Sequence, residues 1–328
     1  MKKNIALVTG GYSNESVISY KTAVTIEANL DKEKFNIYVV DISPVGWTCS
    51  LPGGEKKEID KNDFSVSFNG THIKFDAVYI GMHGTPGEDG KLQGYFDSIK
   101  LPYTGCDAAT SAITFNKRYT TAVAGMGGIS VARSILVFKS NPLRTDDIAA
   151  SLKFPVFVKP NNGGSSIGMS KVADPEQLDM AIKKAFNEDD QVLVEEMING
   201  REFTIGVFRK DAEVITLPIT EVKTEKDFFD YEAKYEGKSK EITPAEIEEE
   251  TAYKIREAAR KIYMLFNCHG VVRIDFIYNE LDGNPYMLEI NTIPGQSEAS
   301  IIPQQVKAMG LKLKDFYASI LEDAFNRK

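Results

Sequence analysis

The stretch FVKPNNGGSSIGM, residues 157–169, joins a short apolar run to a loop rich in glycine and serine. Such a loop can approach a phosphate closely, because glycine has no side chain and backbone N–H groups can point at the anion. It is not a P-loop, since the GxxxxGK[ST] spacing is absent and Lys159 precedes the glycines instead of following them. The stretch therefore predicts a different kind of phosphate cradle, placed after a strand.

A second stretch, RIDFIYNELDGNPYMLEINTIPG at 273–295, predicts two adjacent strands joined by a hairpin turn. Residues two apart on a strand share a face, so Arg273 lies with Asp275 and Glu289 lies with Asn291. Two carboxylates and an amide then converge, and Mg²⁺ favours such oxygen ligands while sharing its shell with substrate phosphates. The alternative is a solvated polar face on an amphipathic ribbon. Two matched acidic faces favour the metal site.

Outward from these stretches, the N-terminal part of the chain has the pattern of a doubly wound α/β sheet. Residues 4–11 and 36–43 predict buried strands around a helix at 16–29. Residues 76–84 predict a further strand whose polar, glycine-bearing end lies where ligands collect in open sheets. The dipeptide Asn69-Gly70 predicts a tight hairpin turn.

From Lys117 onward, short strands alternate with helices, as in an α+β module. The segment 223–242 is polar, carries aromatic residues and interrupts this pattern, and we expect it to be an ω-type lid. The length fits three modules, which we place at 1–116, 117–204 and 205–328.

The composition excludes several classes of function. The 328 residues are 42% hydrophobic and 26% charged, as in ordinary globular proteins. A formal net charge of −8 argues against nucleic acid as the main partner, because phosphate neutralisation needs a basic face. Three scattered cysteines without a CxxC suggest neither a disulfide framework nor a zinc knuckle. No membrane span or signal peptide is evident, so we expect a cytoplasmic protein with no membrane partner.

Taken together, the motifs resemble those of the ATP-grasp ligases: a lysine ahead of a Gly/Ser loop, the acidic strand end VEEMI at 194–198, and RID…LEINTIPG. The whole chain resembles the D-alanine–D-alanine ligase family through GGYSNESVIS, MHGTPGEDGKLQG, VKPNNGGSSIGM, FFDYEAKYEGKSKEITPA and LEINTIPGQSEAS, in that order. The resemblance implies a pre-ATP-grasp domain followed by a two-module ATP-grasp fold. It also implies a homodimer that makes D-alanyl-D-alanine for peptidoglycan precursors.

The reaction implied by the resemblance has two steps. The carboxylate of one D-alanine attacks the γ-phosphorus of ATP, giving an acyl phosphate and ADP. The amine of a second D-alanine then attacks the activated carbonyl, and phosphate leaves. Two Mg²⁺ ions, with Mn²⁺ as a substitute, would be held by Asp275, Glu289 and Asn291. Arg273 and the backbone N–H of Gly295 would form the oxyanion hole.

The resemblance also assigns an ATP site. Lys117 and Lys159 would contact phosphate oxygens beneath the Gly163–Ser166 loop, Glu195 would lie near the adenine amino group and Glu202 near the ribose. Without the resemblance, surface charge or core packing would explain most of these residues. The implied ATP-binding residues are Lys117, Lys159, Ser166, Glu195, Glu196, Met197, Ile198, Glu202 and Lys234.

The substrate subsites follow from the same resemblance. Glu15 would receive the ammonium group of the first D-alanine near His83, although a structural histidine at a strand end is the alternative for His83. Ser165 and Tyr235 would join Glu15 in a hydrogen-bonded bridge to the lid. The residues implied around the second D-alanine are Ser300, through its hydroxyl, and Ile301, through its backbone.

Three other functions stay open. A ligase of the same fold could make a D-lactate or D-serine product, although the tyrosine in EAKYEGKS favours the dipeptide. A nicotinamide-dependent dehydrogenase is suggested by VTGG after the first strand, but GxGxxG is absent. A non-catalytic nucleotide-binding regulator would not need the full set of Arg273, Asp275, Glu289 and Asn291.

Overall fold

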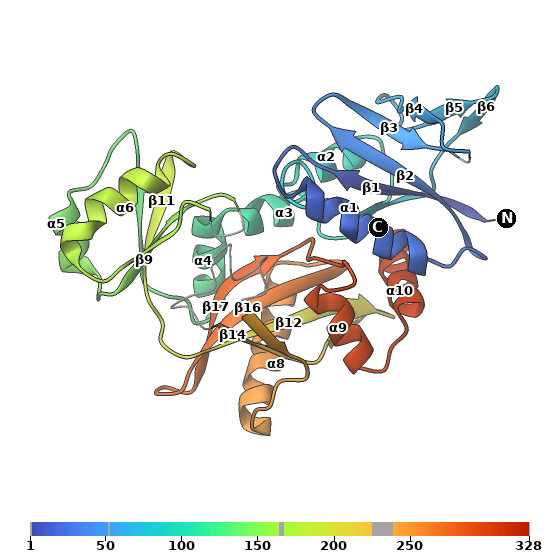
Figure 1. Cartoon of the computed structure of the whole chain (residues 1–328). Helices are drawn as coiled ribbons and strands as arrows, with labels where there is room; N and C mark the ends of the chain where they lie inside the picture. The colour runs from blue at the N-terminus through green and yellow to red at the C-terminus, as the bar shows by residue number, and fades with distance from the viewer. Residues whose placement is uncertain (1, 52, 164–166, 225–238, 328) are drawn as a thin grey trace.

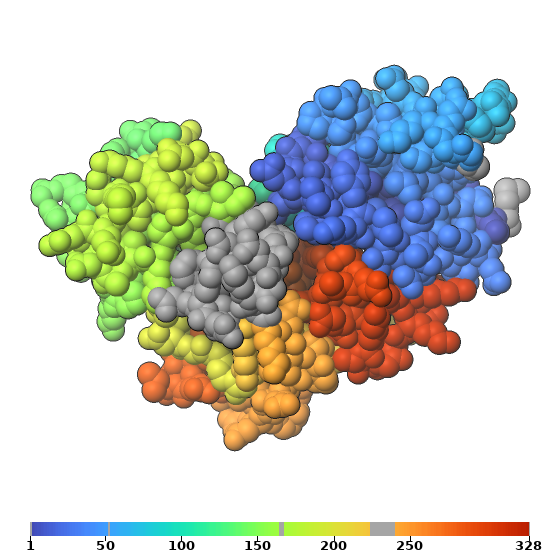
Figure 2. All heavy atoms as spheres, viewed as in Figure 1, coloured from blue at the N-terminus to red at the C-terminus, as the bar shows by residue number. Residues whose placement is uncertain are grey.

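Three sheets of four or more strands organise the described part of the chain, one in each of three lobes (Figure 1). The computed structural model describes residues 2–51, 53–163, 167–224 and 239–327. We call the lobes N-terminal, central and C-terminal after the order in which the chain forms them. A notch separates the N-terminal lobe from the central lobe, and the C-terminal lobe lies beneath both (Figure 2).

The N-terminal lobe is built on a sheet with the strand order β4-β3-β2-β1-β7. Strands β1 (Lys3–Gly10), β2 (Phe35–Ser43) and β7 (Ala77–Ile80) run parallel, and α1 (Ser16–Asn29) forms the crossover between the first two. β1 and β7 are buried along most of their length, which explains their nearly continuous apolar sequences. The predicted strand–helix–strand opening is confirmed. The lobe also contains β3 (Gly46–Ser50), β4 (Lys56–Glu58), β5 (Val66–Phe68), β6 (Thr71–Ile73), α2 (Lys91–Ser98) and α3 (Ala108–Phe115).

The hairpin predicted in this lobe is also confirmed. β5 and β6 pair antiparallel with Phe68 opposite Thr71, so that Asn69 and Gly70 alone make the turn. Their φ angles are 48° and 74°. A type I′ turn requires positive φ at both positions, which is why Asn-Gly is favoured there.

The central lobe is a four-stranded antiparallel sheet, β10-β9-β11-β8, covered by α5 and α6. Helix α6 buries Leu178, Ala181, Ile182 and Ala185 at helical spacing against the sheet. The sheet delivers Lys159 to the end of β9, directly before the glycine-rich loop. The elements are α4 (Lys117–Met126), β8 (Ser134–Phe138), α5 (Thr145–Ser151), β9 (Val156–Pro160), β10 (Ser170–Val172), a 3₁₀ turn (Pro175–Gln177), α6 (Leu178–Ala185) and β11 (Gln191–Glu196).

The C-terminal lobe has the sheet β15-β14-β12-β16-β17, with β13 paired to β12. Helix α8 packs its buried residues Ile255, Ala259 and Ile262 into a core shared with Phe203 and Ile205 of β12. The elements are β12 (Arg201–Lys210), β13 (Glu213–Thr216), β14 (Thr220–Thr224), β15 (Ser239–Ile242), α8 (Glu249–Leu265), β16 (Val271–Asn279), β17 (Asn284–Asn291), α9 (Ile301–Ala308) and α10 (Leu313–Asn326).

One hydrophobic core joins the N-terminal lobe to the C-terminal lobe. It contains Ile26 of α1 and Tyr79 of β7 together with Phe208 of β12 and Phe316 and Tyr317 of α10. The rings of Tyr79 and Tyr317 lie 5.9 Å apart, and those of Phe208 and Phe316 lie 5.1 Å apart. The last helix therefore fixes these two lobes against each other, as its position beside α1 in Figure 1 illustrates.

The predicted fold class, a parallel α/β sheet followed by two α+β modules, is confirmed by this architecture. Of the predicted domain boundaries, 116/117 falls between α3 and α4. The boundary at 204/205 falls inside β12, which pairs with β16 from Arg201 onward, and we propose that the last module begins at Arg201. None of the helices in the described ranges has the length and apolarity that crossing a bilayer requires.

Candidate active site

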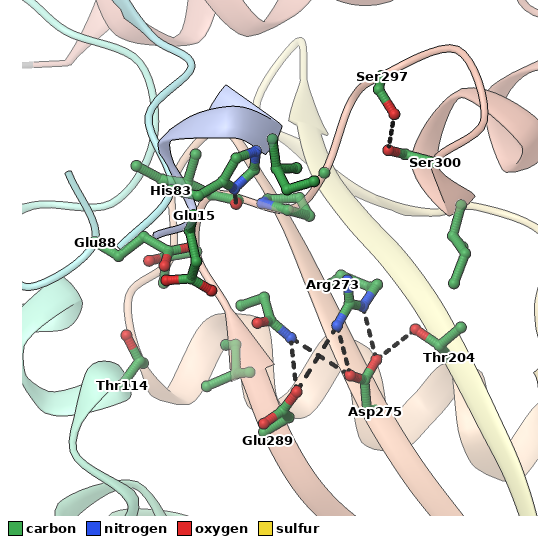
Figure 3. A pocket seen from close by; sticks show the side chains of 18 of the residues that line it. Glu15, His83, Glu88, Thr114, Thr204, Arg273, Asp275, Glu289, Ser297 and Ser300 are labelled. Atoms are coloured by element: carbon green, nitrogen blue, oxygen red, sulfur yellow. Dashed lines mark hydrogen bonds and ion pairs between the residues drawn. The ribbon is translucent and has the colours of Figure 1, made fainter. Parts of the chain in front are cut away.

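A pocket of about 400 Å³ opens where the three lobes meet. Its walls come from the start of α1, the loop after β7, the junction of α3 and α4, strands β12, β16 and β17, and the loop leading into α9. Figure 3 shows three groups of side chains around it: the acidic pair Glu15 and Glu88, the cluster around Arg273, and the Ser297–Ser300 pair. Segments far apart in the chain thus supply one site.

The predicted cluster on β16 and β17 is present. Arg273 pairs with Asn291 and Asp275 with Glu289 in the antiparallel register, and a bulge follows Asp275. The guanidinium of Arg273 donates from Nε and Nη2 to the two carboxylate oxygens of Asp275 at 2.9 and 2.7 Å, and Nη2 lies 3.8 Å from Glu289 Oε1. Burial opposes the charge of Arg273, but the carboxylates of Asp275, Glu289 and Glu88 outweigh it and raise the pKa of the guanidinium.

A buried polar network not predicted from the sequence holds this cluster from behind. The Thr204 hydroxyl donates to Asp275 Oδ1 at 2.5 Å, and both side chains are buried. Gln305 of α9 is fully buried, donates to the Thr204 carbonyl and to Thr220 Oγ1 at 3.0 Å each, and accepts from the Gly206 N–H at 2.9 Å. Partners of this kind orient a carboxylate for a ligand.

The donor atoms present fit a magnesium site. The Nδ2 atom of Asn291 lies 3.4 Å from both Asp275 Oδ2 and Glu289 Oε1, so the three side chains converge on one region. A half-turn of the amide would present Oδ1 in place of Nδ2. Among the described residues no three His, Cys, Asp or Glu side chains form a metal cluster. Two carboxylates and an amide suit Mg²⁺ better than a transition metal, because Mg²⁺ takes few protein ligands and keeps positions for phosphate oxygens.

The two lysines predicted for the phosphate site lie on α4 and on β9. Lys117, the first residue of α4, donates from Nζ to the carbonyl of Gly163 at 2.6 Å, and both residues line the pocket with Glu202. Lys159 on β9 lies 2.6 Å from Glu195 Oε1 on the neighbouring strand, with side chains only 12% and 7% exposed. This ion pair lies outside the residues that line the pocket.

Three further residues of the predicted ATP site lie near Glu195. Glu196 accepts a hydrogen bond from the Lys153 N–H at 2.9 Å, and the N–H of Met197 donates to Pro155 O at 3.0 Å. Ile198 follows in the same chain segment. None of the three lines the pocket. The remaining predicted residues Ser165, Ser166, Lys234 and Tyr235 lie outside the described residues.

Breaking the buried ion pair from one side should be costly. We expect Lys159→Met to lower the free energy of unfolding by about 3–5 kcal/mol, because Glu195 would remain as an unpaired buried charge. The double variant Lys159→Met/Glu195→Gln should recover most of that loss. Urea unfolding without nucleotide measures both. Additive losses in the double variant would show that the two side chains do not interact.

A second carboxylate stands beside Glu15 and was missed by the sequence reasoning. Glu88 accepts from the N–H of Gly84 at 2.8 Å through Oε2. Burial, followed by the charge of Glu15, raises the pKa of Glu88 to about 8. Gly84 has φ +69°, and a Cβ there would lie 2.7 Å from Glu15 Oε2, so only glycine allows both carboxylates to approach this loop. The acidic residues of HGTPGEDG were the available signal.

The raised pKa of Glu88 predicts a pH dependence of stability. Its stabilising contribution is fully present below the ordinary value of 4.5 and is lost as the pH rises through about 8. We therefore expect Glu88→Gln to flatten the decline of the unfolding free energy between these values. His83, whose pKa is lowered to about 4, makes the unfolding free energy rise with pH, and it does so equally in both proteins. The difference between wild type and Glu88→Gln therefore reports on Glu88 alone. Urea unfolding at a series of pH values measures this. If the unfolding free energies of the two proteins changed in parallel with pH, the prediction would be contradicted.

His83 is placed at the pocket but its ring is occupied. Nε2 lies 2.9 Å from Thr22 Oγ1, and Nδ1 lies 2.9 Å from the carbonyl oxygen of Ile293. Burial lowers the pKa of His83 to about 4, so the imidazole is neutral at physiological pH. The structure thus brings His83 to the predicted place, with both nitrogens engaged by the protein.

The loop before α9 closes the pocket. Gly295 lies there, and a Cβ at that position would meet Ser300 Oγ at 2.9 Å. Ser300 Oγ is 2.7 Å from Ser297 Oγ, and Ile301 begins α9, so the positive end of this helix faces the pocket. The predicted residues that line the pocket together are Glu15, His83, Lys117, Glu202, Arg273, Asp275, Glu289, Asn291, Gly295, Ser300 and Ile301.

Comparison with known proteins gives consistent matches over the full length. The family models described as D-ala D-ala ligase N-terminus and C-terminus match residues 4–106 and 126–322. A D-alanine–D-alanine ligase of Parabacteroides distasonis is 46% identical over 100% of this chain and 99% of its own length. The crystal structure of the VanG D-Ala:D-Ser ligase from Enterococcus faecalis matches with a TM-score of 0.88 and 32% identity, covering 98% of this chain and 99% of its own. A D-alanine–D-alanine ligase from Bacillus anthracis, solved with ATP, matches with a TM-score of 0.78 and 27% identity over 98% and 97%.

Proposed function

The chain belongs to the D-alanine–D-alanine ligase family, and from that premise we propose that it joins two D-alanine molecules to D-alanyl-D-alanine with ATP as the phosphoryl donor. The family and ligase predictions are confirmed, and the dehydrogenase alternative is set aside. The observation that carries the proposal is the convergence of Arg273, Asp275, Glu289 and Asn291 in one pocket with Glu15. These residues supply the groups that both steps of the reaction need.

The first D-alanine would bind with its ammonium group against the Glu15–Glu88 pair. Two neighbouring carboxylates are costly on their own, and a cation between them relieves that cost. Ammonium binding should also favour loss of the proton from Glu88. The carboxylate of this D-alanine then points toward Arg273, whose charge is held by Asp275, ready for phosphoryl transfer.

The ATP phosphates would lie between the carboxylate cluster and the basic side of the pocket. Lys117 provides that basic side, next to Gly163, and Glu202 would accept a hydrogen bond from the ribose hydroxyl groups. We extend the site to the Lys159–Glu195 pair, with Lys159 toward the phosphates and Glu195 toward the adenine amino group, and with Glu196, Met197 and Ile198 beside Glu195. The roles of Ser165, Ser166, Lys234 and Tyr235 in covering ATP and substrate rest on the family resemblance. They lie outside the described residues.

Asp275, Glu289 and Asn291 would hold the metal, which we propose to be two Mg²⁺ ions, with Mn²⁺ able to replace them. When bound, the metal offsets the negative charge that develops on the phosphoryl oxygens. The Thr204 hydroxyl keeps Asp275 in place for this role.

The second step would use the loop before α9. The backbone N–H of Gly295 and the guanidinium of Arg273 would stabilise the oxyanion as the second amine attacks the acyl phosphate. The start of α9 at Ser300 and Ile301 would receive the carboxylate of the second D-alanine, since helix N-termini favour anions. By resemblance to the family we also propose a cytoplasmic homodimer that serves peptidoglycan synthesis.

The deciding experiment is ADP release from the purified protein with ATP and Mg²⁺, with products identified by mass. The substrates compared are D-alanine, L-alanine, and D-alanine mixed with D-lactate or D-serine. The proposal would be supported if D-alanine gave ADP and D-alanyl-D-alanine while L-alanine gave no product. A mixed product as the main species would keep the mechanism and overturn the specificity. ATP binding without turnover would favour the regulator.

A further inference from the structure

The loop that carries Gly295 is fastened to the N-terminal lobe on both sides of that residue. On one side, the Ile293 carbonyl lies 2.9 Å from His83 Nδ1. On the other side, the N–H of Gln296 lies 3.3 Å from Thr22 Oγ1. His83 Nε2 and Thr22 Oγ1 are themselves 2.9 Å apart, so the bonds form a closed circuit around Pro294 and Gly295.

The donor in each bond of this circuit is fixed by chemistry. A carbonyl oxygen can only accept, so His83 must carry its proton on Nδ1 and donate it to Ile293. The backbone N–H of Gln296 can only donate, so Thr22 Oγ1 accepts there. In the neutral ring Nε2 then has no proton, and it accepts the hydroxyl proton of Thr22. Each of the three donors, His83 Nδ1–H, Thr22 Oγ1–H and Gln296 N–H, has one acceptor within the circuit. Neither ring nitrogen of His83 is therefore available to a ligand.

The circuit is buried, and a further side chain supports it. Thr22, His83, Ile293 and Gln296 are at most 6% exposed. The hydroxyl of Tyr79 donates to Gln296 Oε1 at 3.0 Å, so the side chain of Gln296 is held as well as its backbone. In a buried environment such a satisfied network is rigid, and breaking one bond leaves an unpaired polar group.

We propose that His83 and Thr22 are positioning residues that hold the backbone N–H of Gly295 where the oxyanion forms, and that His83 does this as a neutral ring instead of binding substrate. The proposal rests on the proposed function, which places the oxyanion at Gly295. It replaces the substrate-binding role expected for His83 from the sequence.

The arrangement links the two halves of the substrate site. Helix α1 begins directly after Glu15, which receives the first substrate, and carries Thr22 two turns later. Ser19 on the same helix accepts from the backbone N–H of His83 at 2.9 Å. One rigid helix therefore sets the distance between the ammonium subsite and the oxyanion loop. Catalysis depends on this kind of preorganisation.

The tautomer of His83 is the first test, because it does not depend on activity. In ¹⁵N-labelled protein, two-bond ¹H–¹⁵N correlations distinguish Nδ1–H, Nε2–H and imidazolium forms. The chain has three histidines, so His72→Gln and His269→Gln variants identify the His83 signals by elimination. We expect the Nδ1–H form at neutral pH. An Nε2–H ring or an imidazolium would overturn the proposal.

The second test is kinetic and uses Thr22→Val, which keeps the shape and removes the hydroxyl. We expect kcat to fall roughly 10-fold or more, since a displaced oxyanion donor loses transition-state stabilisation. The KM values for ATP and D-alanine should change less than about threefold, as expected when ground-state binding is kept. Thr22→Ser restores the hydroxyl and should restore kcat.

Thr9→Val is the matched control. Thr9 is also buried in the N-terminal lobe, and its hydroxyl has no hydrogen-bond partner in the described part of the chain. Its kcat should equal that of the wild type. An unchanged kcat in Thr22→Val, or a rise in the D-alanine KM alone, would overturn the proposal. If the wild type made no dipeptide, the proposed function would fail, while the tautomer would still decide whether His83 clamps the loop.

Discussion

Replacing Arg273 by lysine should lower kcat by about 10²–10³-fold, the usual effect of removing one oxyanion donor. Lysine keeps the positive charge, but its ammonium cannot reproduce the two parallel bonds that Nε and Nη2 make to Asp275. Without those two bonds, Asp275 no longer fixes the direction in which the positive group at position 273 points into the pocket. Steady-state kinetics with saturating ATP and D-alanine measure the effect.

The alanine variant would test something different. Arg273→Ala removes the only arginine among the described residues that line the pocket, from beside Asp275, Glu289 and Glu88. Stability should then fall by about 3–5 kcal/mol, and a loss of activity could reflect unfolding. The lysine variant avoids this, and Arg260→Lys, in an exposed pair with Glu257, provides the control. Full activity in Arg273→Lys would mean that positive charge alone matters at this position and that the two parallel bonds to Asp275 have no catalytic role.

Local patterns were sufficient for the elements that carry much of this site. The helix predicted at 16–29 coincides with α1 (Ser16–Asn29), because the flanking strands and the polar loop before it mark its ends. The faces predicted for Arg273, Asp275, Glu289 and Asn291 followed from the two-residue period of strands. The predicted hairpin places β16 and β17 side by side and fixes their register, so that these four side chains meet.

Other features depend on contacts that no local pattern contains. Thr22 and Gln296 are 274 positions apart and meet only because α10 holds the N-terminal and C-terminal lobes together. The neutral state of His83 and the raised pKa of Glu88 arise from burial, which needs the assembled pocket. Even the strand predicted at 76–84 ends earlier, at Ile80, because the residues after it turn to form that pocket.

Glu289→Gln should weaken the requirement for metal in a measurable way. We expect the Mg²⁺ concentration for half-maximal rate to rise at least about 10-fold, because affinity for a hard cation depends on the number of charged ligands. Without metal the variant should be no less stable than the wild type, since it removes one negative charge from a pocket that also holds Glu15 and Asp275. Titration of the rate with Mg²⁺ at saturating ATP measures the shift.

The same variant allows a measurement that does not involve turnover. ADP with Mg²⁺ should raise the melting temperature of the wild type, because a ligand that binds only the folded state stabilises it by mass action. In Glu289→Gln this rise should shrink, whereas the rise with ADP in the presence of a chelator should be the same in both proteins. Glu257→Gln removes an exposed carboxylate of the same lobe and should behave as the wild type. If Glu289→Gln kept the full metal-dependent rise, the carboxylate on β17 would not be a metal ligand, and its contact with Arg273 would be its main role.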